Sequence, residues 1–185
     1  MTLSAHDVAR ELRKRLPGVG DVKVHKLLYY CQGWHLAFTG KPLFPERVEA
    51  WANGPVVADL WKDEKYDRPA DPPQTLDTSA LSTLSYVVAR YGRFTGKQLI
   101  ALTHDERPWI DASQRANAEW DNSDLTFDAL KDFFLEDDCV RPSRELLESV
   151  LLDPEVFTLL EDSLKEMVRH KGIPDDFSKL VEPEA

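Results

Sequence analysis

The stretch VHKLLYYCQGWHLAFTGKPLFPERVEAWANGPVVADLW, residues 24–61, decides the fold class of this chain. Its first part is apolar at most positions, and Asp21 precedes it as a candidate N-cap. The face with the clearest three- and four-residue spacing carries Val24, Leu27, Cys31, Trp34 and Phe38. A helix that is apolar nearly all round is buried, so we expect a central, mostly buried helix that Thr39 and Gly40 close.

The second part of this stretch changes from helix to extended chain and back. We expect residues 48–51 (VEAW) to form a short strand, in a small hairpin or at the edge of a sheet. Asn53-Gly54-Pro55 then breaks the pattern, and Pro55 suits the first turn of a helix, where its missing amide proton costs nothing. The apolar side of the predicted helix carries Val56, Val57, Leu60 and Trp61.

Caps and apolar stripes predict further helices. Ser4 with Asp7, and Thr95 with Gln98, form capping-box patterns, and Thr126 is a third N-cap. Apolar residues repeat at helical spacing in four more segments: Val8, Leu12 and Leu16; Leu81, Leu84, Val87, Val88 and Tyr91; Leu99 and Leu102; Phe127, Leu130, Phe133 and Phe134. The sequence therefore predicts a mainly α, compact multi-helix domain.

Polar segments connect these helices. Residues 67–77 (DRPADPPQTLD) are expected to form a surface loop, because proline and aspartate interrupt both helix and strand. Residues 104–109 (HDERPW) are expected to be irregular, and residues 111–124 are polar without a clear pattern.

The C-terminal part of the chain differs from the rest in charge. Of the net charge of −10, residues 137–185 carry −7, from six Lys/Arg against thirteen Asp/Glu. We divide the chain into a domain of residues 1–138 and an acidic C-terminal helical extension of residues 139–185. The two amphipathic helices expected in this extension need a surface to bury against, on the domain or on a partner. Its charge either keeps the protein soluble or steers a basic protein partner.

Bulk properties place the chain among ordinary globular proteins. Its 185 residues suffice for one well-buried core, and no apolar run approaches the ~20 residues of a membrane span. We expect a cytoplasmic protein without a membrane partner, and the two cysteines fit a reducing compartment. An acidic chain repels phosphate backbones, so a nucleic-acid partner is a poor first interpretation.

The sequence itself predicts no metal site, no cofactor and no catalytic residues. His25, Cys31 and His35 share one helix, but no paired cysteines or second motif complete a zinc site, and a buried helix face explains Cys31 equally well. Residues 104–106 (HDE) resemble an acid–base cluster, yet adjacent residues of a turn point in different directions. A solvated loop or a helix C-cap is the better interpretation, and we expect a protein that is not an enzyme.

Three blocks of sequence carry a resemblance to a known family. They are KLLYYCQGWHL (residues 26–36) with TGKPLF (39–44), EAWANGPVV (49–57), and THDERPW (103–109). Together they resemble the Panacea domain, over about residues 5–135. The resemblance implies a mainly α-helical antitoxin domain of bacterial and phage toxin–antitoxin pairs, which neutralises a cognate protein toxin by direct contact. It leaves residues 139–185 outside, and our hypothesis is that this extension carries toxin specificity.

Two other functions stay open beside direct neutralisation. A related member of the family is an adaptor that delivers its toxin to an ATP-dependent protease, so this chain could act in the same way. Some antitoxins instead bind DNA and regulate their own operon, but the charge of −10 and the lack of a basic recognition helix count against that function here.

The partner-binding residues are expected around the turn that follows the central helix. Rigid aromatic side chains bind proteins well, because they offer a large apolar area and lose little side-chain entropy. Trp51 is expected to be partly exposed, whereas Trp34 is expected to belong to the core. The predicted set that organises or lines the recognition surface is Tyr29, Trp51, Asn53, Gly54, Pro55, Val56, His104 and Trp109.

Overall fold

The computed structural model describes residues 3–118 and 123–136. The predicted helices of residues 139–185, and the domain boundary at 138, lie outside the described residues. In chain order the elements are α1 (Ala5–Arg15), α2 (Asp21–Thr39), β1 (Val48–Trp51), β2 (Gly54–Val57), α3 (Ala58–Lys65), α4 (Thr78–Tyr91), α5 (Gly96–His104), α6 (Arg107–Ala118), β3 (Asp124–Leu125) and α7 (Phe127–Glu136). The described part is mainly α with one small antiparallel sheet, which confirms the predicted fold class.

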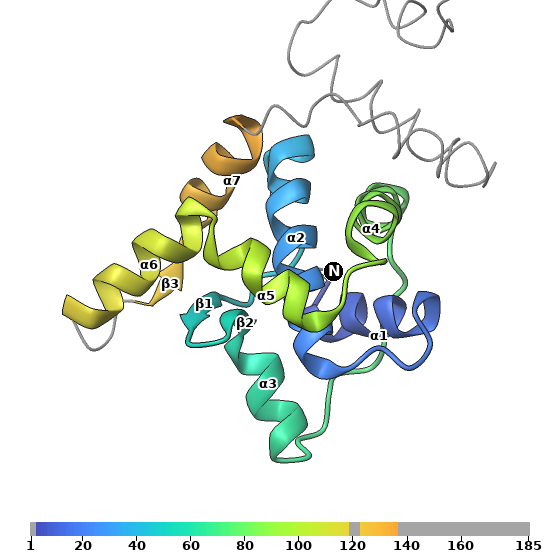
Figure 1. Cartoon of the computed structure of the whole chain (residues 1–185). Coiled ribbons are helices and arrows are strands. Elements are labelled where there is room, and N and C mark those ends of the chain that lie inside the picture. The colour runs from blue at the N-terminus through green and yellow to red at the C-terminus, as the bar shows by residue number, and fades with distance from the viewer. Residues whose placement is uncertain (1–2, 119–122, 137–185) are drawn as a thin grey trace, which may run out of the picture.

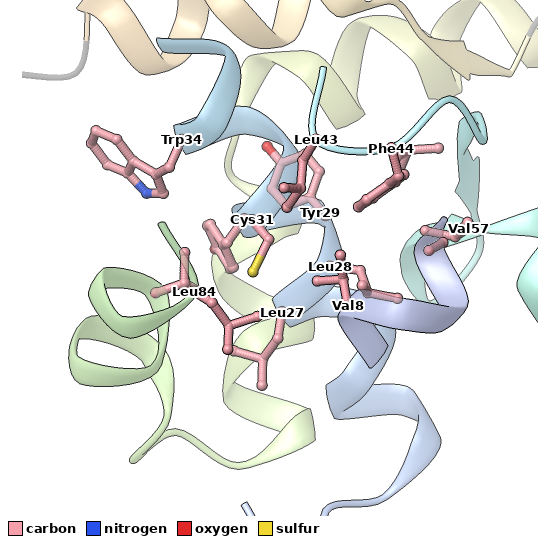
Figure 2. Packing of buried hydrophobic residues seen from close by; sticks show 14 of the residues in the cluster. Val8, Leu27, Leu28, Tyr29, Cys31, Trp34, Leu43, Phe44, Val57 and Leu84 are labelled. Carbon is pink, nitrogen blue, oxygen red and sulfur yellow. The ribbon is translucent and has the colours of Figure 1, made fainter. Parts of the chain in front are cut away.

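Helix α2 lies in the middle of the described part and contacts α1, α4, α5, α7 and strand β2 (Figure 1). Every residue from Val24 to Ala37 is buried, as expected for a helix that is apolar nearly all round. Figure 2 shows how Leu27, Leu28 and Cys31 of this helix pack among side chains from the surrounding elements. Four helices and strand β2 therefore surround α2, while α3, α6 and β1 contact these neighbours and β3 contacts β1 and α6.

The closest helix packing occurs at Gly33, where α2 meets α7. A Cβ added at Gly33 would lie 2.0 Å from Cε2 of Phe134. The Phe134 ring also packs edge-on against Trp34, with centroids 5.2 Å apart. Glycine at this position allows the aromatic ring of α7 to lie directly on the backbone of α2.

The helix ends follow the predicted caps in most cases. Both capping boxes are present, at Ser4 with Asp7 and at Thr95 with Gln98. Gly40 closes α2 in the left-handed conformation, with φ of 71°. The prediction of Asp21 as the N-cap of α2 is wrong by one residue, because Gly20 takes the extended N-cap conformation and Asp21 is the first helical residue.

The sheet has the strand order β2-β1-β3, and both pairs are antiparallel. The predicted strand at residues 48–51 is confirmed as β1, and it forms a hairpin with β2. Ala52 and Asn53 lie at the tip of the hairpin, and Gly54 follows them with φ of 88°. The short strand β3, which the sequence did not reveal, completes the sheet.

Pro55 lies in strand β2, so the prediction that it opens a helix is wrong. The residue opposite Pro55 is Ala50, whose N–H donates to Ser123 on the other side of β1, at 2.8 Å. Proline is tolerated on an edge strand when its missing N–H is not needed by the neighbouring strand. Helix α3 begins three residues later, at Ala58, so Val56 and Val57 belong to the strand and not to the helix.

The segment that was expected to be irregular is the junction of two helices. Helix α5 ends at His104 and α6 begins at Arg107, with Pro108 in its first turn, where a missing N–H costs nothing. Helix α6 continues to Ala118 through residues that gave no clear pattern. Among the described residues, no helix is long and apolar enough to cross a membrane.

Candidate functional site

The hairpin tip and the junction of α5 and α6 meet at one place on the surface of the molecule. Trp51 and Asn53 come from the hairpin, Trp61 from α3, and His104 and Trp109 from the two sides of the α5–α6 junction. Asn53 is exposed, and the four rings are partly exposed. We call these five residues the aromatic corner.

Trp51 connects the hairpin to α3. Its ring lies edge-on against Trp61, with centroids 4.9 Å apart, and its indole N–H donates to Oε2 of Glu49 at 2.8 Å. Lys65 places its ammonium 4.4 Å from the centroid of the Trp61 ring. The partial exposure expected for Trp51 is confirmed, so part of a large apolar side chain is available at the surface.

His104 and Trp109 connect the α5–α6 junction to the same hairpin. Their rings stack with centroids 3.9 Å apart and an interplanar angle of 17°. The indole N–H of Trp109 donates to the backbone oxygen of Trp51, at 3.1 Å. Burial lowers the pKa of His104, and the charge of Lys26 lowers it further. The imidazole is therefore neutral at pH 7, and it stacks without the cost of burying a charge.

Lys26 of α2 lies beneath the hairpin and is 1% exposed. Its ammonium donates to the backbone oxygen of Pro55 at 2.9 Å, and among the described residues it has no carboxylate within ion-pair distance. Burial lowers the pKa of Lys26 to about 8. The backbone of Gly54 lies against this side chain: a Cβ there would be 2.8 Å from Cε of Lys26 and 2.8 Å from Oγ1 of Thr103.

Glu106 joins the α5–α6 junction to the core. Its carboxyl oxygens accept hydrogen bonds from Tyr29, at 2.6 Å, and from Tyr30, at 2.9 Å. Burial raises the pKa of both tyrosines, and the charge of Glu106 raises it further, so both hydroxyls stay protonated and can donate. Sequence reasoning placed residues 104–106 in a solvated loop or at a helix C-cap, and it missed this role of Glu106.

One signal in the sequence pointed to such a residue. Tyr29 and Tyr30 are adjacent polar groups on a helix that was predicted to be buried, and buried hydroxyls need partners. Both are 0% exposed in the structure. An acceptor was therefore required from another element, although the sequence could not say which one.

The predicted site residues fall into two groups in the structure. Trp51, Asn53, His104 and Trp109 reach the surface and lie together at the aromatic corner. The other four, Tyr29, Gly54, Pro55 and Val56, are buried and can organise this surface but cannot line it. Trp61 was assigned only to a helix face, and its contact with Trp51 adds it to the site. Trp34 belongs to the core, as expected, and is 1% exposed.

The histidines and the cysteine of α2 are occupied in packing and hydrogen bonding. His35 contacts Oγ1 of Thr83 at 2.9 Å, and Nδ1 of His25 accepts from the backbone of Val57 at 3.3 Å. Burial raises the pKa of the Cys31 thiol, and within the described ranges no three His, Cys, Asp or Glu residues gather as metal ligands. These contacts fix α2 to α4 and β2.

Residues 104–106 do not form an acid–base cluster. His104 stacks on Trp109, Asp105 is the exposed C-cap of α5, and Glu106 accepts from the tyrosines of α2. The expected divergence of these side chains is confirmed, and of the two interpretations offered the helix C-cap is the one found, at Asp105. The hydrogen bonds of Glu106 to the tyrosines were not predicted. The arrangement presents partly exposed rings that are held by contacts with one another and by the Trp109–Trp51 hydrogen bond.

Comparison with known proteins gives one match. Residues 24–110 match the model of the family described as "Antitoxin SocA-like, Panacea domain", and this stretch runs from α2 into α6. The match includes the whole aromatic corner and the three blocks of sequence that resemble the family. No curated protein and no solved structure shows a significant match. Residues 24–110 of the chain are thus similar to the Panacea domain of SocA-like antitoxins.

Proposed function

We propose that this chain is the antitoxin of a toxin–antitoxin pair in the cytoplasm, and that it neutralises a cognate protein toxin by direct contact at the aromatic corner. The family supports an antitoxin role, and an antitoxin of this kind needs a protein partner. The toxin is expected to be the product of the adjacent open reading frame.

The observation that carries this proposal is the gathering of partly exposed aromatic rings on a rigid support. The rings of the aromatic corner are held by contacts with one another and by the Trp109–Trp51 hydrogen bond. Binding energy in protein interfaces concentrates in such aromatic residues, which lose little side-chain entropy when a partner covers them. The corner therefore has the composition and the preorganisation of a binding hot spot.

The charges beside the aromatic corner favour a basic surface on the toxin. Asp105 and Asp111, on either side of Trp109 in the chain, are exposed and have no ion-pair partner among the residues that the structure describes. Arg107 between them pairs with Glu136. Unpaired carboxylates next to the aromatic rings would attract lysine and arginine side chains of a partner and accelerate association.

A substitution at Asn53 tests this proposal with little risk to the fold. Asn53→Arg introduces bulk and positive charge at the exposed hairpin tip, and we expect it to abolish co-purification with the toxin and rescue of growth. Thr75→Arg is the matched control, because Thr75 is exposed in the loop between α3 and α4. Toxin binding that is unchanged by Asn53→Arg would exclude the aromatic corner as the contact surface.

Neutralisation by direct contact does not require an ATP-dependent protease, whereas delivery of the toxin for degradation does. Direct blocking predicts that growth is rescued equally in cells with and without the ATP-dependent proteases, and that the purified complex withholds toxin activity in vitro. Rescue that disappears in the protease-deficient cells would contradict direct blocking and favour the adaptor function.

A further inference from the structure

Glu106 links the core to the aromatic corner. It lies between Asp105, the C-cap of α5, and Arg107, the first residue of α6. Its carboxyl group accepts from the hydroxyls of Tyr29 and Tyr30, which α2 holds within the core at 0% exposure. Glu106 is thus a surface-junction residue whose side chain is anchored in the central helix.

The backbone of Glu106 starts the helix that carries Trp109. Its carbonyl oxygen accepts from the N–H of Trp109, at 3.2 Å, and from the N–H of Ile110, at 3.1 Å. These bonds form the first turn of α6, so the place of Glu106 determines where this turn begins. A shift of Glu106 would carry the Trp109 indole with it.

The Trp109 indole in turn holds the hairpin. Its N–H donates to the backbone oxygen of Trp51 at 3.1 Å, while its ring stacks on His104. A continuous series of contacts thus runs from the tyrosine hydroxyls through Glu106 and Trp109 to Trp51. It joins the buried helix α2 to the hairpin, although the two tyrosines themselves are fully buried.

We propose that Glu106 is a positioning residue for partner recognition, held by the Tyr29 and Tyr30 hydroxyls so that the aromatic corner is in its binding arrangement before the partner arrives. This inference rests on the proposed function. Hydrogen bonds to a charged acceptor are among the stronger ones in proteins, and two of them restrain one carboxylate in both position and rotation. A preorganised surface binds more tightly, because less ordering is needed on association.

The first test measures the corner without a partner. In the full chain carrying Tyr29→Phe and Tyr30→Phe, we expect the Trp109 indole N–H to exchange with solvent at least about tenfold faster, as measured by NMR, because its bond to Trp51 opens more often. Tyr91→Phe is the matched control: it removes another buried hydroxyl, which accepts from the Trp34 indole and not from the corner. Unchanged protection of the Trp109 indole in the Tyr29→Phe/Tyr30→Phe chain would overturn the inference.

The second test measures affinity for the toxin by a double-mutant cycle. We expect Tyr29→Phe/Tyr30→Phe to weaken binding about tenfold, although neither side chain is exposed, and to have no further effect in a Glu106→Ala background. Glu106→Gln should restore part of the affinity lost in Glu106→Ala, since its amide keeps an acceptor oxygen. If Tyr29→Phe/Tyr30→Phe lowers the affinity by the same factor with and without Glu106→Ala, the hydroxyls act on the fold and not through Glu106. That result would overturn the inference.

The two tests separate this inference from the proposed function. If the wild-type chain does not bind the toxin, the proposed function fails, but the indole exchange still decides whether Glu106 positions Trp109. If the chain with both tyrosine substitutions does not fold, Tyr29→Phe alone, which removes the 2.6 Å bond, takes its place with the same two measurements.

Discussion

Helix α2 and the aromatic corner are both rich in aromatic residues, yet their tryptophans lie in opposite environments. Trp34 of α2 is 1% exposed and has aromatic neighbours on several sides, including Tyr86 at 4.9 Å and Phe134 at 5.2 Å. Trp51 of the corner is partly exposed, and within the described residues its aromatic neighbour is Trp61. A tryptophan of a family motif can therefore stabilise the core or form part of the surface, and its packing environment decides which. Substitutions in the two regions should therefore separate stability from binding.

The largest effect is expected at Trp34. Trp34→Ala removes the centre of the aromatic packing around α2 and the indole bond to Tyr91, so we expect a loss of about 3–5 kcal/mol in the free energy of unfolding. Urea denaturation measures this loss. A folded Trp34→Ala chain that keeps its stability but loses toxin binding would contradict the separation of the two regions.

Acid should weaken the packing of α2. Burial lowers the pKa of His25 and of His35 from the ordinary 6.5 to about 4. The unfolded chain then binds more protons than the folded one, so stability is full above pH 6.5 and is lost as the pH falls toward 4. At pH 5 the expected loss is about 2 kcal/mol for each histidine.

Urea denaturation between pH 8 and pH 5 measures this loss. The variant His25→Gln/His35→Gln is the control, and its stability should depend less on pH over this range. An equally steep pH dependence in this variant would assign the acid sensitivity to other groups.

Gly54 lies at the boundary between the two regions, and its substitution should have an intermediate effect. Gly54→Ala combines a positive φ of 88° with contacts of 2.8 Å to Lys26 and Thr103, so we expect a loss of about 2 kcal/mol in stability, together with weaker toxin binding. Gly18→Ala is the matched control, since Gly18 has φ of 78° but open space around its Cβ position. Equal effects of the two substitutions would show that the close approach of Gly54 to Lys26 and Thr103 adds nothing to the cost of the substitution.

The smallest effect on stability is expected at Trp51. Trp51→Ala removes a partly exposed ring with one aromatic neighbour, so we expect a loss of only about 1–2 kcal/mol in stability but a loss of toxin binding that pull-down detects. If Trp51→Ala unfolds the chain, or leaves toxin binding intact, the placement of the interface at the aromatic corner is wrong.

The helices whose signals are local could be predicted from the sequence. The capping boxes at Ser4 and Thr95, and the glycine closure at Gly40, depend on hydrogen bonds and torsion angles within a few residues, and all three are confirmed. The burial of α2 could also be predicted, because an apolar surface on all sides leaves no face for water.

Elements and contacts that depend on distant partners could not be predicted. Pro55 was expected in a helix, but it pairs with β1 because Ala50 directs its N–H to Ser123, far along the chain. Strand β3 has only two residues and exists through its pairing with β1. Glu106 was expected in a solvated loop or at a helix C-cap, and its acceptance from hydroxyls of residues 76 and 77 positions away was not foreseen.

The sequence by itself determined the mainly helical class, the central position of α2 and its closure at Gly40, and it carried the resemblance to the Panacea domain, because these follow from local periodicity and from ordered motifs. Only the tertiary structure decided which motif residues form the surface. It placed Trp51, Asn53, His104 and Trp109 together and buried Tyr29, Gly54, Pro55 and Val56 beneath them. The physical reason is that exposure and hydrogen-bond partners are properties of packing between distant segments, and no local pattern encodes them.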